Sequence, residues 1–358
     1  MDAAVSGVGG RPASGGRWPA EGRATAEGQA GANGQAAASR RARGRLLGGR
    51  AWKLWLAPAL FTVASGLAVV RLAGSASVLR HTSIDWTYLA AAAAIYPLFA
   101  ALRGVRFRLL MAGQLSWRET VGVGWLYSAA CSILPGGLGE ASLPALYGSV
   151  AGGAADATAA IVTTRVQDLL SWLVVLVAGG FLAGRLLPAA AMPLLALALL
   201  ITAGGTLVAF SGSFRRFAFR LAAPLPAVAF FLEELDGRLG PMGGNWPSWG
   251  VTLALRLAST FKYYFALRAF GAPVTPAMAA VGGALLALML VIPIQGVAGL
   301  GTVELWWIAA LALFAIPGPV AAVAALGTHV LLLVVSMACG GIALAWAPAG
   351  SLQRKAVA

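Results

Sequence analysis

The sequence predicts an all-α protein that crosses a membrane several times. Of its 358 residues, 59% are hydrophobic and only 11% are charged, and the mean hydropathy is +0.81. A soluble domain has about 45–50% apolar and about 25% charged residues. Two apolar runs are also interrupted by proline and glycine and then followed by a glutamate. We therefore expect about six full spans and two re-entrant hairpins made of broken helices.

The basic residues are distributed as in a membrane protein. The net charge is +14, and nine of the 26 basic residues lie in the first 53 positions, while most of the others flank apolar runs. This pattern is typical of membrane orientation and of contact with lipid headgroups, and it does not indicate nucleic-acid binding. Cys131 and Cys339 lie in apolar runs without a CxxC motif or a nearby histidine. We expect neither a disulfide nor a metal site, and no cofactor.

The composition divides the chain into three regions. Residues 1–50 are rich in Gly, Ala, Ser and Arg without a hydrophobic period, which predicts a disordered basic cytoplasmic tail. Residues 51–348 are expected to form a single transmembrane domain, and residues 349–358 a short cytoplasmic tail. Inside the domain, residues 211–247 predict a cytoplasmic connector that begins with an interfacial amphipathic segment.

A helix needs about 20 apolar residues to cross a membrane. Full spans are expected at Leu54–Val70, Trp86–Leu102, Ala157–Ala183, Ala189–Phe210, Trp249–Leu267 and Val320–Trp346, and re-entrant pairs of half-helices at Val121–Ala151 and Met278–Ile316. Beyond the tail, ten basic residues then lie on the inner side and four on the outer side. This bias predicts cytoplasmic N- and C-termini in a bacterial-type inner membrane. Two ordinary spanning pairs would instead give ten crossings, with Glu140 and Glu304 at the surface.

Both broken segments have the order Pro, then Gly-Leu-Gly, then Glu. The expected hinges are Pro135, Gly137 and Gly139 before Glu140, and Pro293, Gly299 and Gly301 before Glu304. Proline removes a backbone donor and glycine disfavours the helix, so each break leaves peptide groups unpaired. Such groups are tolerated at membrane depth only inside protein or beside a wet cavity. The first hairpin would enter from the cytoplasm and the second from outside, as inverted repeats would give, and this pattern points to a transport site.

Six ionisable residues fall at the predicted membrane depth: Glu140, Arg165, Asp168, Arg256, Lys262 and Glu304. Each costs about 2.5–3.5 kcal/mol at a helix centre, so each should face a partner or water. Arg165 and Asp168 are three residues apart on one helix and are able to pair. The set could form internal salt bridges, or it could line a polar cavity that accepts a charged headgroup. We favour the cavity, because a buried ion pair seldom improves on apolar packing.

Two further groups have a structural and a functional interpretation. His329 on the last span is expected to be a hydrogen-bonded structural residue in preference to a proton relay. Arg103, Arg106 and Arg108, at the inner end of the second span, would act as an inner-leaflet basic group, either for anchoring or for phosphate capture. The sequence has no G-x-x-x-x-G-K-[ST] loop and no G-x-S-x-G elbow, which argues against an ATP-driven pump and a serine hydrolase.

Four stretches in this order resemble the lysylphosphatidylglycerol synthase transmembrane region. They are Arg103 to Leu110, Pro135 to Glu140, Arg165 to Asp168, and the Gly-Leu-Gly-Thr-Val-Glu run that ends at Glu304. The resemblance spans about Leu54 to Trp346. That family includes the flippase domain of the multiple peptide resistance factor and many stand-alone flippase-like membrane proteins.

The resemblance implies translocation of a lipid between leaflets, in the best-known cases an aminoacylated phosphatidylglycerol. For this chain we expect a charged phospholipid or glycolipid, with an anionic or aminoacylated headgroup. The resemblance also implies that Glu140, Arg165, Asp168 and Glu304 line the translocation cavity, to which we add Lys262. The chain lacks the soluble aminoacyl-transferring domain of the full-length synthases, so we expect no enzymatic activity. The alternative is a non-catalytic membrane subunit that partners a glycosyltransferase or another lipid-modifying enzyme through the basic tail and the connector.

Overall fold

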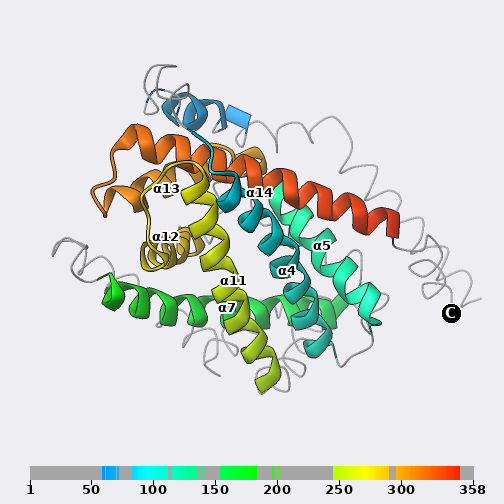
Figure 1. Cartoon of the computed structure of the whole chain (residues 1–358). Helices are drawn as coiled ribbons and strands as arrows, with labels where there is room; N and C mark the ends of the chain where they lie inside the picture. The colour runs from blue at the N-terminus through cyan, green and yellow to red at the C-terminus, as the bar shows by residue number, and fades with distance from the viewer. Residues whose placement is uncertain are drawn as a thin grey trace, which may run out of the picture. The chain divides into compact units, whose positions relative to one another are not determined.

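The computed structural model describes residues 59–60, 62–69, 71, 83–111, 115–134, 139–140, 154–183, 196, 200, 245–289 and 296–346. The regular elements of these residues are all helices, which confirms the all-α prediction for this part of the chain. In chain order they are α4 (Trp86–Leu110), α5 (Trp117–Ile133), α7 (Ala154–Leu182), α11 (Trp246–Ala269), α12 (Pro276–Met289), the 3-10 turn η1 (Val297–Gly299), α13 (Thr302–Ala312) and α14 (Gly318–Trp346) (Figure 1).

Three of the described helices are long and apolar enough to cross a membrane, namely α4, the Asp156–Leu182 part of α7, and α14. They correspond to three of the six expected spans. The expected span Trp249–Leu267 is matched by α11, which has 24 residues but carries three basic side chains and is not in that set. Most of the expected span Ala189–Phe210 and of the 211–247 connector lies outside the described residues, as do both tails. The number of crossings therefore stays a prediction.

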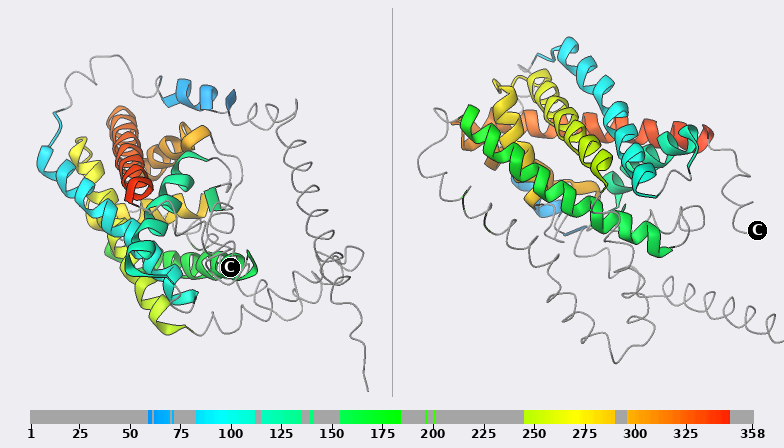
Figure 2. Two further views of the ribbon diagram at one scale, coloured as in Figure 1. Left: turned by 90° about the vertical axis from the view of Figure 1, so that its right-hand side faces the viewer. Right: turned by 90° about the horizontal axis from the view of Figure 1, so that it is seen from below.

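Helices α4 and α11 form an antiparallel pair. The start of α4 meets the end of α11, where the Asp85 amide donates to the Ala269 carbonyl at 3.0 Å. At the other end, the Asn245 side chain caps α11 and also donates to the Leu109 carbonyl of α4 at 2.9 Å. Figure 2 shows α11 lying between α4 and α7, and α11 contacts both.

Glycines set the distance between α4 and α5. A Cβ atom added at Gly104 would overlap the Thr120 carbonyl oxygen, and one added at Gly124 would overlap the Ala100 carbonyl oxygen. Small residues let helix backbones approach closely, as is common in membrane bundles. Helix α5 in turn packs against α14, and α12 packs against α7, while the fully buried Trp307 of α13 fills the space beside Gly282 of α12.

The described residues show where both predicted breaks interrupt the helices. Helix α5 ends at Ile133, and helical backbone is found again at Gly139 and Glu140. A Cβ atom at Gly139 would overlap the backbone of Cys131, so the chain folds back closely on α5. Helix α12 is described as far as Met289, and the chain at 296–301 is not α-helical before α13 begins at Thr302. With 11 residues, α13 is too short to cross a membrane alone.

The second break contains the left-handed backbone that its glycines allow. The φ angles are 71° at Gly299 and 79° at Gly301, and Ala298 also has a positive φ of 53°. The Gly296 amide donates to the Thr302 hydroxyl at 2.9 Å, which holds the two ends of the turn together. The predicted hinges Pro135, Gly137 and Pro293 lie outside the described residues.

Candidate functional site

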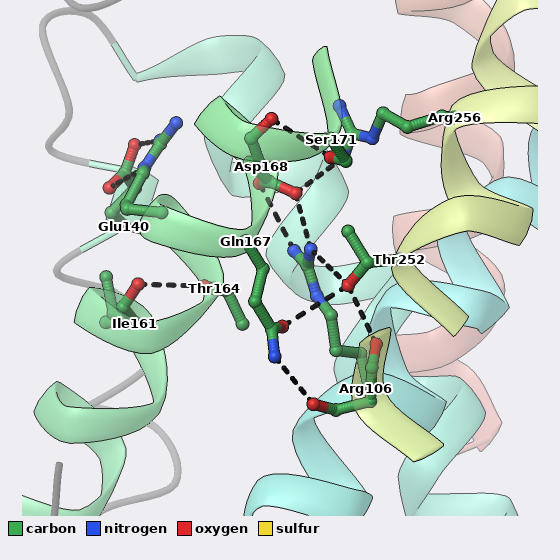
Figure 3. A network of polar contacts seen from close by, with 11 residues as sticks. Arg106, Glu140, Ile161, Thr164, Gln167, Asp168, Ser171, Thr252 and Arg256 are labelled. Atoms are coloured by element: carbon green, nitrogen blue, oxygen red, sulfur yellow. Dashed lines mark hydrogen bonds and ion pairs between the residues drawn. The ribbon is translucent and has the colours of Figure 1, made fainter. Parts of the chain in front are cut away.

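Asp168, near the middle of α7, is held between two buried arginines from other helices (Figure 3). Arg106 of α4 donates from Nη1 to Oδ1 at 2.5 Å and from Nη2 to Oδ2 at 3.3 Å. Arg256 of α11 donates to the same Oδ1 oxygen at 2.5 Å. The two arginines are only 2% and 6% exposed. This cluster joins α4, α7 and α11, and it carries one positive charge in excess.

Uncharged polar side chains extend the cluster along α7 and α11. The Thr252 hydroxyl receives a hydrogen bond from Arg106 Nη1 at 3.4 Å and donates to Gln167 Oε1 at 3.2 Å. The Gln167 amide then donates to the Ser248 hydroxyl at 2.6 Å. All three uncharged residues are buried. These three residues were not predicted from the sequence as site residues, although Ser248, Thr252 and Arg256 recur every four residues, which is the spacing of one helix face.

The position of Arg106 corrects its assignment to the inner-leaflet basic group. We expected the second span to end at Leu102, whereas α4 continues to Leu110. The Arg106 side chain therefore enters the bundle, where Asp168 compensates its charge. Arg108 behaves as a helix-end residue, since its Nη1 donates to the Leu115 carbonyl at 2.5 Å and its guanidinium lies 4.4 Å from the centre of the Trp117 ring.

A second ion pair joins the first break to α7. Arg165 Nε donates to Glu140 Oε2 at 2.8 Å, and Arg165 Nη2 contacts Glu140 Oε1, so the pair is bidentate. Unlike the Asp168 cluster, this pair is accessible, with the Arg165 side chain 45% and the Glu140 side chain 23% exposed. Arg165 and Asp168 therefore have separate partners, and the direct pairing expected from their spacing is replaced by two contacts with other helices.

The second break has a comparable contact. His329 Nδ1 lies 2.8 Å from Glu304 Oε1, and His329 Nε2 lies 3.0 Å from the Ala298 carbonyl oxygen. Glu304 is only 1% exposed, and its Oε2 has no hydrogen-bond partner among the described residues. The histidine thus connects α14 to both ends of the break, which agrees with the structural, hydrogen-bonded role expected for it.

The two glutamate contacts occupy equivalent positions in the sequence. In each, 25 residues separate the glutamate from its partner. The helices that supply the partners, α7 and α14, are both long and apolar. The same arrangement of break, acid and long helix thus occurs twice in the chain.

Lys262 of α11 lies apart from these acids. It is 4% exposed, and its Nζ is 4.1 Å from the centre of the Phe99 ring, 4.3 Å from that of Tyr263 and 5.5 Å from that of Tyr96. Arg103 lies against the same Phe99 ring, at 4.7 Å. The structure thus places Lys262 beside Arg103 among aromatic rings.

Comparison with known proteins identifies the family of the chain. The profile of the lysylphosphatidylglycerol synthase transmembrane region matches residues 52–340. The chain belongs to this family. No curated protein and no solved structure gives a significant match. The resemblance inferred from the four motifs is therefore confirmed. Membership of the lysylphosphatidylglycerol synthase transmembrane family, together with the apolar helices, indicates a membrane-embedded, lipid-related protein.

Proposed function

We propose that this protein moves the charged headgroup of a phospholipid or glycolipid between the two leaflets of the membrane, and that it acts as a transporter and not as an enzyme. The observation that carries the proposal is the accessible Glu140–Arg165 pair, which lies beside the buried Asp168 cluster on the same apolar helix. Charges at membrane depth normally face a bundle interior or a water-filled path. Here, α7 contributes Asp168 to the buried charged cluster and, within one turn, Arg165 to the accessible ion pair.

The duplicated arrangement supports a transport mechanism. Helices α4 and α11 precede the two breaks and run antiparallel, so the two halves would have opposite orientations in the membrane. Inverted repeats with broken helices are the architecture of many transporters, in which one half rocks against the other around a site near mid-depth. We propose that α4 to α7 and α11 to α14 are such halves, with both termini of the chain in the cytoplasm.

The proposal is tested by leaflet exchange in vesicles that contain the purified full-length protein. Phospholipids and glycolipids with a fluorescent acyl chain are incorporated, and a membrane-impermeant reductant quenches the label that reaches the outer leaflet. We expect Arg165→Met and Glu140→Gln to slow the exchange about tenfold or more, since about 1.4 kcal/mol of lost interaction at the barrier gives a factor of ten.

Arg118→Met provides the matched control. Arg118 is an exposed arginine that lies 5.2 Å from the centre of the Trp346 ring and has no part in the network. This variant should exchange lipid at the wild-type rate. Equal rates in wild type, Arg165→Met and Glu140→Gln would remove the pair from the mechanism. If the protein does not accelerate the exchange of any labelled lipid, the proposed function is overturned.

A further inference from the structure

Lys262 is a buried lysine whose protonated form has no counterion among the described residues. Its ammonium group lies over the faces of Phe99 and Tyr263, and no residue in the described part of the chain gives it an ion pair or a hydrogen bond. Aromatic faces attract a cation, but an ammonium carries three donors that ring faces do not replace. A buried charge of this kind normally has a partner of opposite sign.

A second cation lies close to the first. Arg103 is one helical turn after Phe99 on α4, and its guanidinium is 4.7 Å from the centre of the ring that Lys262 also contacts. It contacts the Tyr127 ring at 5.6 Å and donates to the Ser128 hydroxyl at 3.4 Å, and no described carboxylate forms an ion pair with it. By contrast, Arg106, Arg165 and Arg256 all have one. Two positive groups at one ring repel each other when no counterion is present. An anion bound between them would remove this repulsion.

Hydroxyl groups from two further helices lie near this pair. The Ser132 and Ser336 hydroxyls, from α5 and α14, are 3.0 Å apart. Arg103 reaches this region through Ser128, whose carbonyl accepts a hydrogen bond from the Ser132 hydroxyl at 2.9 Å. Hydroxyl groups can rotate to donate to an anion. Helices α4, α5, α11 and α14 thus place Lys262 and Arg103 beside aromatic rings and near serine hydroxyls.

We infer that Lys262 and Arg103 bind the phosphate anion of the lipid headgroup. The inference rests on the proposed function, which supplies a lipid as the ligand. A purely structural role fits less well, because apolar side chains would pack among these rings without leaving two like charges together. The same chemistry would also suit free inorganic phosphate, which the experiment separates from the lipid.

Binding is measured by titration calorimetry on the full-length protein in an uncharged maltoside detergent. The probes are dihexanoyl phosphatidylglycerol, dihexanoylglycerol, which lacks the phosphate, and inorganic phosphate. We expect wild type to bind the phosphatidylglycerol and to bind dihexanoylglycerol at least tenfold more weakly. Lys262→Met and Arg103→Met should each weaken phosphatidylglycerol binding at least tenfold, whereas Arg118→Met should leave it unchanged.

Thermal unfolding without added lipid separates a ligand-binding cation from a structural one. Methionine has a similar length and suits an aromatic environment, so Lys262→Met should unfold at or above the wild-type temperature. A variant that binds weakly but is as stable as wild type has lost a binding residue. If Lys262→Met does not fold, Arg103→Met carries the test, since Arg103 is only partly buried.

Three results would overturn the inference: equal phosphatidylglycerol affinity in wild type and Arg103→Met, equal binding of dihexanoylglycerol, or inorganic phosphate binding as tightly as the lipid. The binding assay does not depend on transport. Wild-type protein that binds phosphatidylglycerol through Lys262 but exchanges no lipid would overturn the proposed function alone. If the wild type exchanges lipid normally and both variants bind phosphatidylglycerol as tightly as the wild type, only the phosphate site is overturned.

Discussion

Replacing Asp168 by asparagine tests the charged cluster most directly. The variant keeps the shape of the side chain but leaves Arg106 and Arg256 buried without a counterion. Their donating nitrogens lie 2.5 Å from the same oxygen, so they are no more than about 5 Å apart, and their repulsion is about 3 kcal/mol at an effective dielectric constant near 20. Removing one partner of a buried ion pair costs about 3–5 kcal/mol. We expect Asp168→Asn to lower the free energy of unfolding by this amount.

The free energy of unfolding can be measured by titrating the protein in mixed micelles with a denaturing detergent while following helix content. Asp85→Asn is the matched control, because Asp85 is an exposed N-cap and asparagine caps a helix about as well as aspartate, so a loss of only a few tenths of a kcal/mol is expected. The double variant Asp168→Asn/Arg256→Met should recover part of the loss, since one of the two repelling charges is gone. A loss below about 0.5 kcal/mol in Asp168→Asn, the level of an ordinary surface substitution, would refute the reasoning.

Three other predictions use the same unfolding measurement. Gly104→Ala should cost about 1–3 kcal/mol, because its Cβ overlaps the backbone of α5, whereas Gly122→Ala meets open space and should cost nothing; equal values would contradict the close helix crossing. Gly301→Ala should lower the free energy of unfolding by about 1–3 kcal/mol, because an alanine is strained at a φ of 79°. A loss equal to that of Gly318→Ala, at an open position, would show that the break tolerates other backbone shapes. His329→Ala should lose about 3–5 kcal/mol, because buried Glu304 loses its described partner; wild-type stability would rule the contact out as a source of stability.

The sequence predicted those features that depend on local physics. The breaks before Glu140 and Glu304 were located because proline and glycine act on the helix in which they stand. Helices α7 and α14 were placed within a few residues, since apolar composition and length define a membrane span. The family was identified from motif order, and the profile match confirms it.

The partners of the charged residues could not be predicted in this way. Spacing along α7 suggested that Arg165 pairs with Asp168, yet each finds a stronger contact with a residue 25 to 88 positions away. Such contacts depend on how the helices pack, which the local pattern does not contain. The error at Arg106 has the same origin. An arginine usually ends a span, but here a carboxylate on α7 allows α4 to continue eight residues beyond the expected end.

The two equivalent arrangements in the chain have diverged in chemistry while keeping their geometry. The α14 residues at the positions of Arg165, Gln167 and Asp168 are His329, Leu331 and Leu332, because Arg165 and His329 each lie 25 positions after their glutamate. The histidine keeps the contact with the glutamate. Leucines replace Gln167 and Asp168, so α14 has no equivalent of the charged cluster on α7. In the described part of the chain, the accessible ion pair therefore belongs to one half and the buried acid–histidine contact to the other, while the charged cluster joins the two halves through Arg256 of α11. A headgroup path built on this framework would pass the accessible ion pair of α7, and α14 would contribute the Glu304–His329 contact and the Ser336 hydroxyl.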